Sequence, residues 1–151
     1  MNLPSLVYYH TVSQYRKHYE SLYCSKPILT FDKIPVWFKK SSFRHAFFES
    51  SHRDDKKDKF SPVRSQRIDW IKATLQNSGA MLYCGWDKAK RRYDPRWRVS
   101  VVYDDYVVVI QLRLKQDGSL KAEFRTAYVA DNSIAKIRNS PKWTIEMFQK
   151  K

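Results

Sequence analysis

Residues 98–130 read RVSVVYDDYVVVIQLRLKQDGSLKAEFRTAYVA, and their patterning predicts three antiparallel strands over residues 98–103, 106–115 and 119–130. Each segment is rich in β-branched and aromatic residues and is bounded by turn-forming residues. The last two strands are expected to form a hairpin around Gln116-Asp117-Gly118. A three-residue loop with glycine in its last position suits a type I turn followed by a G1 bulge.

Side-chain patterning selects the register of this hairpin. With the three-residue loop, one face pairs Leu114 with Leu120, Leu112 with Ala122, Ile110 with Phe124 and Val108 with Thr126. The opposite face pairs Arg113 with Lys121, Gln111 with Glu123 and Val109 with Arg125. A two-residue loop would set Ile110 opposite Arg125. Because a slip of one residue moves every side chain to the other face, the longer loop is predicted.

Two helices are predicted upstream of these strands. In residues 61–77, Ser61 is the expected N-cap, Pro62 occupies the first helical position and Gly79 lies beyond the end. The buried stripe of this helix comprises Ile68, Ile71 and Leu75. In residues 11–24, Thr11 is the expected N-cap, and the apolar positions at helical spacing are Val12, Tyr15, Tyr19 and Leu22.

The remaining segments are shorter. Strands are expected at residues 34–38, 43–48 and 81–85, the second because Phe43, His45 and Phe47 alternate along it. Residues 49–59 form a charge-dense connection, residues 86–95 a basic loop and residues 132–139 a short helix. The predicted fold class is α+β, with N-terminal helices packed on a twisted antiparallel sheet of about four strands. Residues 1–151 are expected to form a single domain.

Composition narrows the possible partners. Lysine and arginine total 29 against 15 acidic residues, a formal charge of +14, which favours a polyanionic partner through counterion release. Only three glycines are present, so a glycine-rich phosphate-binding loop is excluded. The two cysteines, Cys24 and Cys84, are far apart in the sequence, which favours reduced thiols over a disulfide framework. Residues 1–8 lack a signal-peptide pattern and no apolar run could span a bilayer, so a cytoplasmic protein with no membrane association is expected.

The available chemistry is cationic and phenolic. The four histidines form no metal-binding pattern, no serine-hydrolase motif is present, and the acidic pairs 54–55 and 104–105 fall in expected turns. Arginine, lysine, histidine, tyrosine and threonine suffice for RNA cleavage by attack of the 2′-hydroxyl on the adjacent phosphate. That reaction needs a base, an acid and fixed cations, so neither a metal nor another cofactor is expected.

Six residues are candidates for this chemistry. Arg64 lies four residues before Ile68 on the apolar stripe, in the first turn of the helix, where the helix dipole disfavours cations. It either belongs to a phosphate site or extends to solvent or to an acidic partner. Arg67, one turn on, could share its pocket. His45 is either an acid–base group or a hydrogen-bonded core histidine. The last strand ends with Arg125, Thr126 and Tyr128, which reach one site only if that strand twists or bulges. For Thr126 and Tyr128 the alternative explanation is ordinary β-propensity.

A second set of residues is expected to attract and steer RNA rather than to react with it. The basic loop contributes Lys88, Lys90, Arg91 and Arg92, whose alternative role is a solvated surface, and the hairpin contributes Arg113 and Lys121. Trp37, Trp86 and Trp97 could stack on bases, although packing in the core explains most tryptophans equally well.

Three stretches, FRHAFFES (43–50), FSPVRSQRIDWIKATL (60–75) and FRTAYV (124–129), occur in this order and resemble the superfamily of barnase, EndoU, colicin-type tRNases and RelE. The phage-borne branch of that superfamily is the nearest in pattern, over roughly residues 30–145. The resemblance implies helices packed on a curved antiparallel sheet whose open side takes RNA, often tRNA. It also implies a toxin that an immunity or antitoxin protein neutralises.

Matched by motif, His45 corresponds to the histidine after the first strand pair, and Arg64 and Arg67 to the arginines opening the long helix. Arg125, Thr126 and Tyr128 correspond to the polar end of the late strand. Tandem histidines and a barnase-like glutamate are not evident, which leaves the acid and the base unassigned. The predicted function is a metal-independent endoribonuclease of the toxin type. The alternatives are a non-catalytic module that binds RNA or DNA, and a basic adaptor or inhibitor that binds an acidic protein.

Overall fold

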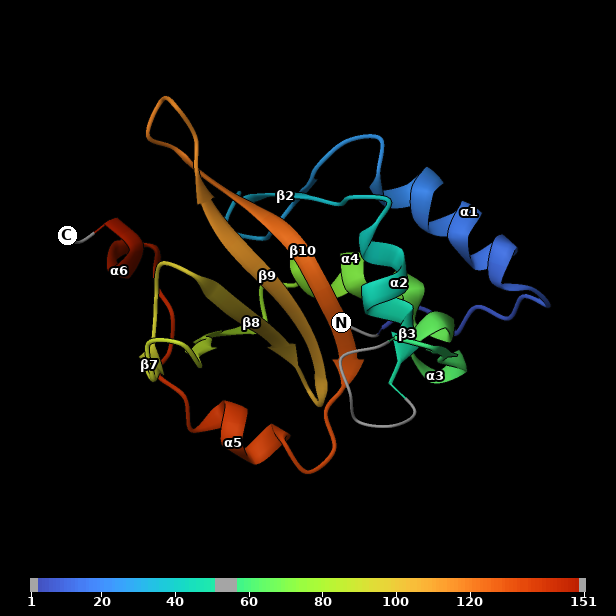
Figure 1. Ribbon diagram of the computed structural model, residues 1–151. Coiled ribbons are helices and arrows are strands. Elements are labelled where there is room, and N and C mark those ends of the chain that lie inside the picture. The colour runs from blue at the N-terminus through green and yellow to red at the C-terminus, as the bar shows by residue number, and fades with distance from the viewer. Residues whose placement is uncertain (1–2, 51–56, 150–151) are drawn as a thin grey trace.

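A mixed sheet of six strands, ordered β1-β2-β10-β9-β8-β5, forms the centre of the computed structural model, which describes residues 3–50 and 57–149 (Figure 1). The strands are β1 (Ile28–Leu29), β2 (Pro35–Trp37), β10 (Leu120–Val129), β9 (Tyr106–Leu114), β8 (Arg98–Tyr103) and β5 (Met81–Cys84). All neighbours are antiparallel except β2 and β10, which are parallel. The α+β class is confirmed, but the sheet has six strands rather than about four, because β1 and β2 join its edge.

The β9–β10 hairpin has the predicted register over its first half. Leu114 pairs with Leu120, and the ladder continues in register to the pair of Ile110 and Phe124. Gly118 adopts a φ of 85°, the left-handed conformation that the loop requires of its last residue. Beyond Phe124 the prediction is wrong. A β-bulge between Phe124 and Thr126 pairs Thr126 with Val109 instead of Val108.

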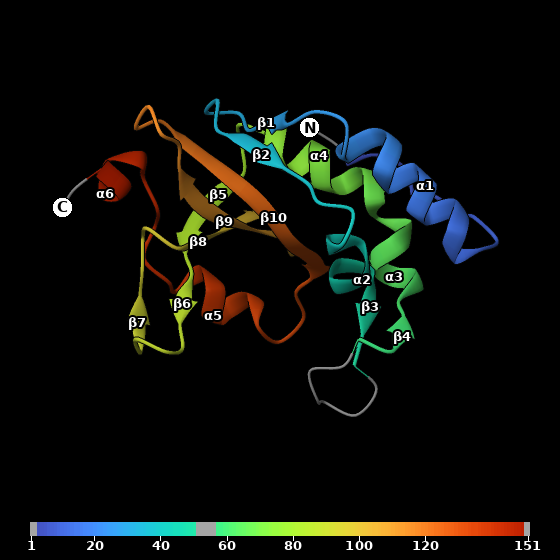
Figure 2. The same ribbon diagram turned by 45° about the horizontal axis from the view of Figure 1, so that its top comes forward.

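Helices α1 (Val12–Tyr23) and α4 (Ile68–Gln76) lie to one side of the sheet, and α5 (Ile134–Arg138) lies to the other (Figure 2). Thr11 caps α1 in a capping box with Gln14, as its sequence indicates. The buried positions of α1 are Tyr15, Tyr19 and Tyr23. These rings pack with Ile71 and Phe124 into the main core, which fills the space between the helices and the sheet.

The strand predicted over residues 43–48 is wrong, because residues 43–47 belong to helix α2 (Ser42–Phe47). Phe43, Ala46 and Phe47 are buried, which is the i, i+3, i+4 spacing of a helix. The same six residues also fit the alternation of a strand, with Phe43, His45 and Phe47 on one face. Packing against the aromatic side chains of α1 selects the helical spacing over this alternation. As a result His45 is exposed on the outer side of α2 rather than aligned with the two phenylalanines.

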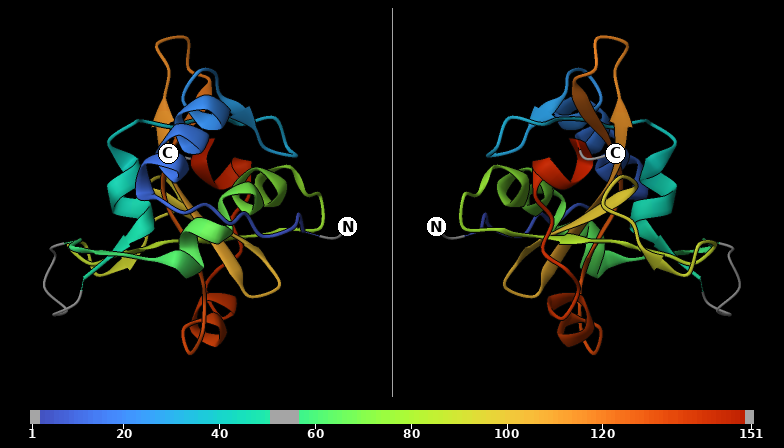
Figure 3. Two further views of the ribbon diagram at one scale, coloured as in Figure 1. Left: turned by 90° about the vertical axis from the view of Figure 1, so that its right-hand side faces the viewer. Right: turned by 90° about the vertical axis from the view of Figure 1, so that its left-hand side faces the viewer.

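The predicted helix over residues 61–77 is divided into α3 (Pro62–Gln66) and α4, because Arg67 leaves the helical conformation with φ −97° and ψ 21°. The Ser61 side chain caps α3 and the stripe of Ile68, Ile71 and Leu75 is buried in α4, both as predicted. Helices α2 and α4 both contribute to the main core, α2 against β10 and α4 against β8 and β9, and the side views show the two helices apart from each other (Figure 3).

Several short elements complete the chain. The connection predicted for residues 49–59 begins and ends in a small ladder, β3 (Phe48–Glu49) with β4 (Lys59–Phe60), and its residues 51–56 lie outside the described part. The basic loop at 86–95 contains the hairpin of β6 (Trp86–Asp87) and β7 (Arg92–Tyr93). Helix α5 matches the predicted short helix, and α6 (Ile145–Gln149) was not predicted. Among the described residues, no helix combines the length and apolarity that crossing a membrane requires.

The face of the sheet opposite the main core is only partly covered. A small second core of Tyr83, Val102, Val107 and Ala130 packs there against Ile134 and Ile137 of α5. The rest of this side, which we call the open face, presents polar and charged side chains of β8, β9 and β10.

Candidate active site

The bulge in β10 brings three predicted residues onto the open face. Thr126 pairs with Val109 and Tyr128 with Val107, and both valines point away from the main core. Arg125 is the extra residue of the bulge and follows Phe124, which points into the main core, so Arg125 also faces outward. From the sequence, these three residues are expected to share a site only if their strand twists or bulges, and the bulge is present.

Helix α2 sets His45 beside these residues, because α2 packs against the second half of β10 and against α3. The partial burial of the imidazole lowers the pKa of His45 below its ordinary value of 6.5. The positive charges of Lys57, Arg125, Arg98 and Arg64 lower the same pKa further. The side chain remains exposed to solvent and has no hydrogen-bond partner among the described residues. His45 is thus a neutral, accessible imidazole surrounded by cations.

Arg98 belongs to this cluster, and sequence reasoning missed it. It pairs with Gln111 across β8 and β9, which places its side chain on the open face. Burial and the neighbouring charge of Arg125 lower the pKa of Arg98, and Asp87 partly opposes this effect. The sequence feature that could have identified Arg98 is the turn at Asp104-Asp105. Pairing Tyr103 with Tyr106 across it sets Arg98 opposite Gln111, which the predicted hairpin already placed opposite Glu123.

Three polar atoms of this cluster are buried without a hydrogen-bond partner in the described part of the chain. They are Nε of Arg98, Nε of Arg125 and the hydroxyl oxygen of Thr126. Buried polar groups are nearly always paired, so each unpaired one requires an explanation. Two of these atoms belong to cationic side chains, and the charge of Arg125 disfavours the charged form of Arg98. An anionic ligand with several acceptor oxygens would satisfy all three, and a phosphodiester has that chemistry.

Arg64 connects α3 to the site. It donates to the carbonyl of Ala46 in α2 at 3.2 Å, and its Nε lies 3.6 Å from the Glu49 carboxylate. Its guanidinium also lies over the ring of Tyr128, 5.7 Å from the ring centre. Burial raises the pKa of Tyr128, although the charge of Arg64 partly opposes the shift, so this phenol stays protonated and can donate a hydrogen bond.

The other predicted residues lie around or away from this cluster. Arg67 donates to the Val63 carbonyl at 2.8 Å and lies over the ring of Trp70, so its part in the site stays a prediction. Arg113 and Lys121 face each other in the hairpin, and Arg113 approaches Glu123 at 3.7 Å. The basic residues of the β6–β7 hairpin are all exposed. They are Lys88, Lys90, Arg91 and Arg92, of which Lys90 pairs with Asp94 at 3.3 Å.

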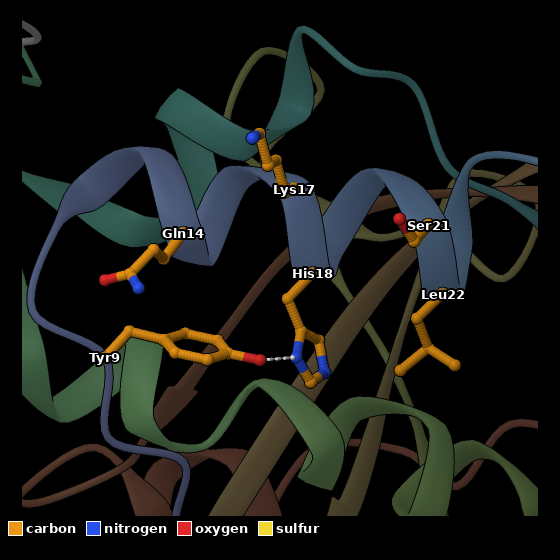
Figure 4. Close-up of a pocket in the computed structure, with 6 residues that line it drawn as sticks. All are labelled: Tyr9, Gln14, Lys17, His18, Ser21 and Leu22. Atoms are coloured by element: carbon orange, nitrogen blue, oxygen red, sulfur yellow. Dashed lines mark hydrogen bonds between the residues drawn. The ribbon is translucent and has the colours of Figure 1, made fainter.

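A shallow pocket of about 560 Å³ lies elsewhere, between α1 and the segment that precedes it (Figure 4). In it the Tyr9 hydroxyl bonds to Nδ1 of His18 at 2.9 Å, and Nε2 of His18 lies 2.7 Å from the Asp69 carboxylate. The backbone of the segment before α1 is also held by a hydrogen bond, because the Val7 N–H donates to the Gln66 carbonyl at 2.8 Å. This arrangement, which we call the N-terminal clasp, fastens residues 7–9 to α1 and α3, and His18 links α1 to α4.

Within residues 3–50 and 57–149 no group of three or more His, Cys, Asp or Glu side chains is arranged to hold a metal ion. Comparisons of this chain with protein-family models, with curated proteins and with solved structures give no match.

Proposed function

We propose that this chain is an endoribonuclease that cleaves RNA without a metal ion, using the cluster of His45, Arg98, Arg125, Thr126 and Tyr128. The observation that carries the proposal is the set of three buried polar atoms on Arg98, Arg125 and Thr126 that have no partner among the described residues, beside a neutral imidazole. Donors that are already in place and lack a protein partner are suited to the charge that develops on a phosphate in a transition state.

In the proposed reaction His45 takes the proton of the 2′-hydroxyl. Because partial burial and the surrounding cations keep the pKa of His45 low, the imidazole is free to accept that proton at neutral pH. The 2′-oxygen then forms a bond to phosphorus and the bond from phosphorus to the 5′-oxygen breaks. The products are a 2′,3′-cyclic phosphate and a 5′-hydroxyl, whose proton comes from solvent at this exposed face.

The remaining residues stabilise and orient the substrate. Arg98 and Arg125 donate to the non-bridging oxygens, which carry the extra negative charge of the phosphorane. The hydroxyls of Thr126 and Tyr128 donate to the ribose or to the departing oxygen. Arg64 is held by Ala46 and Glu49, so it joins α2 to Tyr128 and supports the positions of both.

Biological context rests on the sequence resemblance. It supports a toxin-type enzyme that acts on cellular RNA, tRNA among the candidates, and an antitoxin or immunity protein as partner. The charge of +14 agrees with an RNA substrate and would favour an acidic neutralising protein.

The test is incubation of the purified protein with total bacterial RNA in EDTA, followed by end-group analysis of the products. Wild type should yield discrete fragments with 2′,3′-cyclic phosphate ends, and His45→Ala and Arg98→Gln should not. Arg44→Gln is the matched control, because it removes the same charge from a side chain that lies over the ring of Phe48. Intact RNA that stays bound to wild type would overturn the proposal in favour of a non-catalytic binding module.

A further inference from the structure

The open face extends beyond the catalytic cluster to the edge of the sheet. In the parallel pairing of β2 with β10, Val36 lies beside Ala122 and Trp37 beside Glu123 (Figure 1). Val36 and Ala122 are both fully buried in the main core. Trp37 and Glu123 therefore point to the opposite side, which is the open face, because neighbouring residues of a strand alternate between its two faces.

Trp37 is 43% exposed, although it belongs to the central sheet. Along β10 its neighbour Glu123 precedes Arg125 by two residues, a separation of about 7 Å in an extended strand. The indole is thus within about one nucleotide of the donors that would hold the phosphate. An exposed tryptophan at that position is suited to a flat, apolar surface such as a nucleobase.

The charges around Trp37 also favour a nucleic-acid strand. Glu123 lies 3.7 Å from Lys39 on one side and 3.7 Å from Arg113 on the other. Its single negative charge is thereby offset by two cations. Lys121, opposite Arg113, adds a further positive charge along β10. A phosphate backbone that leaves Arg125 toward the hairpin would follow these cations, with its bases turned toward Trp37.

Resting on the proposed function, we infer that this half of the open face binds the unpaired nucleotides that flank the scissile phosphate, with one base stacked on Trp37. Base pairing removes a base from any such stacking surface, because both of its faces are already stacked within a helix. The substrate class is therefore RNA that is single-stranded at the cut site, such as a loop or an end, and not a continuous duplex.

The first test measures binding, so that it does not depend on cleavage. A short fluorescent 2′-O-methyl oligonucleotide cannot react, and its affinity in EDTA is read by fluorescence anisotropy. Trp37→Ala should weaken binding about tenfold and Trp37→Phe much less, since stacking on one aromatic residue is of that order. A control is Tyr8→Ala, because Tyr8 is an aromatic residue that is 69% exposed and belongs to the N-terminal clasp rather than to the open face.

Abasic nucleotides then identify the stacked base. An abasic substitution at one position should weaken binding to wild type and have little further effect in Trp37→Ala, because both changes remove the same contact. A blunt duplex of the same sequence should bind more weakly than the single strand.

Equal affinity of wild type and Trp37→Ala for the single strand would overturn the inference, as would additive effects of Trp37→Ala and the abasic site at every position. A protein that binds the oligonucleotide as expected but never cleaves RNA would overturn the proposed function and leave this binding surface established.

Discussion

The N-terminal clasp and the proposed catalytic cluster each contain one histidine, His18 and His45, and the surroundings of the two are opposite. His18 has a partner at both ring nitrogens, the Tyr9 hydroxyl and the Asp69 carboxylate. His45 has no hydrogen-bond partner among the described residues and is surrounded by cations that lower its pKa. A side chain whose polar atoms all have protein partners stabilises the fold. A side chain without partners, whose protonated form is disfavoured by nearby positive charges, is available to bind a ligand. The pocket in Figure 4 therefore has a structural role.

The largest expected effect is that of His45→Ala on cleavage. Loss of a general base should reduce the rate by about 10²- to 10⁴-fold. The free energy of unfolding should change by less than about 0.5 kcal/mol, because His45 is exposed and makes no hydrogen bond within the described chain. Cleavage assays and urea unfolding on the same preparation measure both. Retention of the full rate would show that His45 is a surface residue.

Arg125→Gln should reduce cleavage by about 10²- to 10³-fold through loss of transition-state stabilisation. The same substitution should leave stability unchanged or raise it, because the charge of Arg125 opposes that of Arg98 in the folded state. Single-turnover kinetics and thermal unfolding separate the two effects. A large loss of stability would indicate instead that Arg125 holds the bulge in place.

His18→Ala should show the reverse pattern. The variant loses two hydrogen bonds of the clasp, one of them to a carboxylate, and should be destabilised by about 1 kcal/mol with cleavage retained. Tyr9→Phe removes one of these bonds and should cost less. Loss of cleavage in a folded His18→Ala protein would contradict the structural role given to the clasp.

The smallest effect concerns pH. The pKa of His45 lies below 6.5. Cleavage should therefore decline as the pH falls through this lowered pKa, because the imidazole then becomes protonated. Lys57→Gln removes one of the charges that disfavour the imidazolium, so the acid limb should move to higher pH, toward 6.5. Between the lowered pKa and 6.5 the native state binds fewer protons at His45 than the unfolded chain, so stability also falls as pH drops through that interval. An acid limb that moves to lower pH would have the wrong sign.

The central strands could be predicted from the sequence because residues 98–130 carry a consistent local pattern. Turn residues, alternation and strand propensity agree there, and the loop around Gly118 has the expected conformation. Residues 43–48 are different, because six residues contain both a period of two and a helical spacing. Only the aromatic stripe of α1 resolves the ambiguity, and contacts between distant segments are not visible in a local pattern.

The site could be predicted in part. Arg125, Thr126 and Tyr128 were identified as a group that needed a bulge, but alternation alone gives no position for an unpaired residue. Arg98 was missed because it comes from a third strand, and its place beside Arg125 depends on two successive registers. Local sequence thus indicated the type of chemistry, while the membership of the cluster depended on tertiary pairing.

The position of β10 in the sheet has a consequence for hydrogen exchange. This strand pairs with β9 on both sides of the bulge and with β2 at Ala122 and Glu123, so its amides should be among the slowest of the described chain to exchange. Local opening that released Arg125 or Thr126 would disrupt much of the sheet. The protein can therefore adapt little to the shape of its ligand, and the conformational adjustment on binding has to come from the nucleic acid.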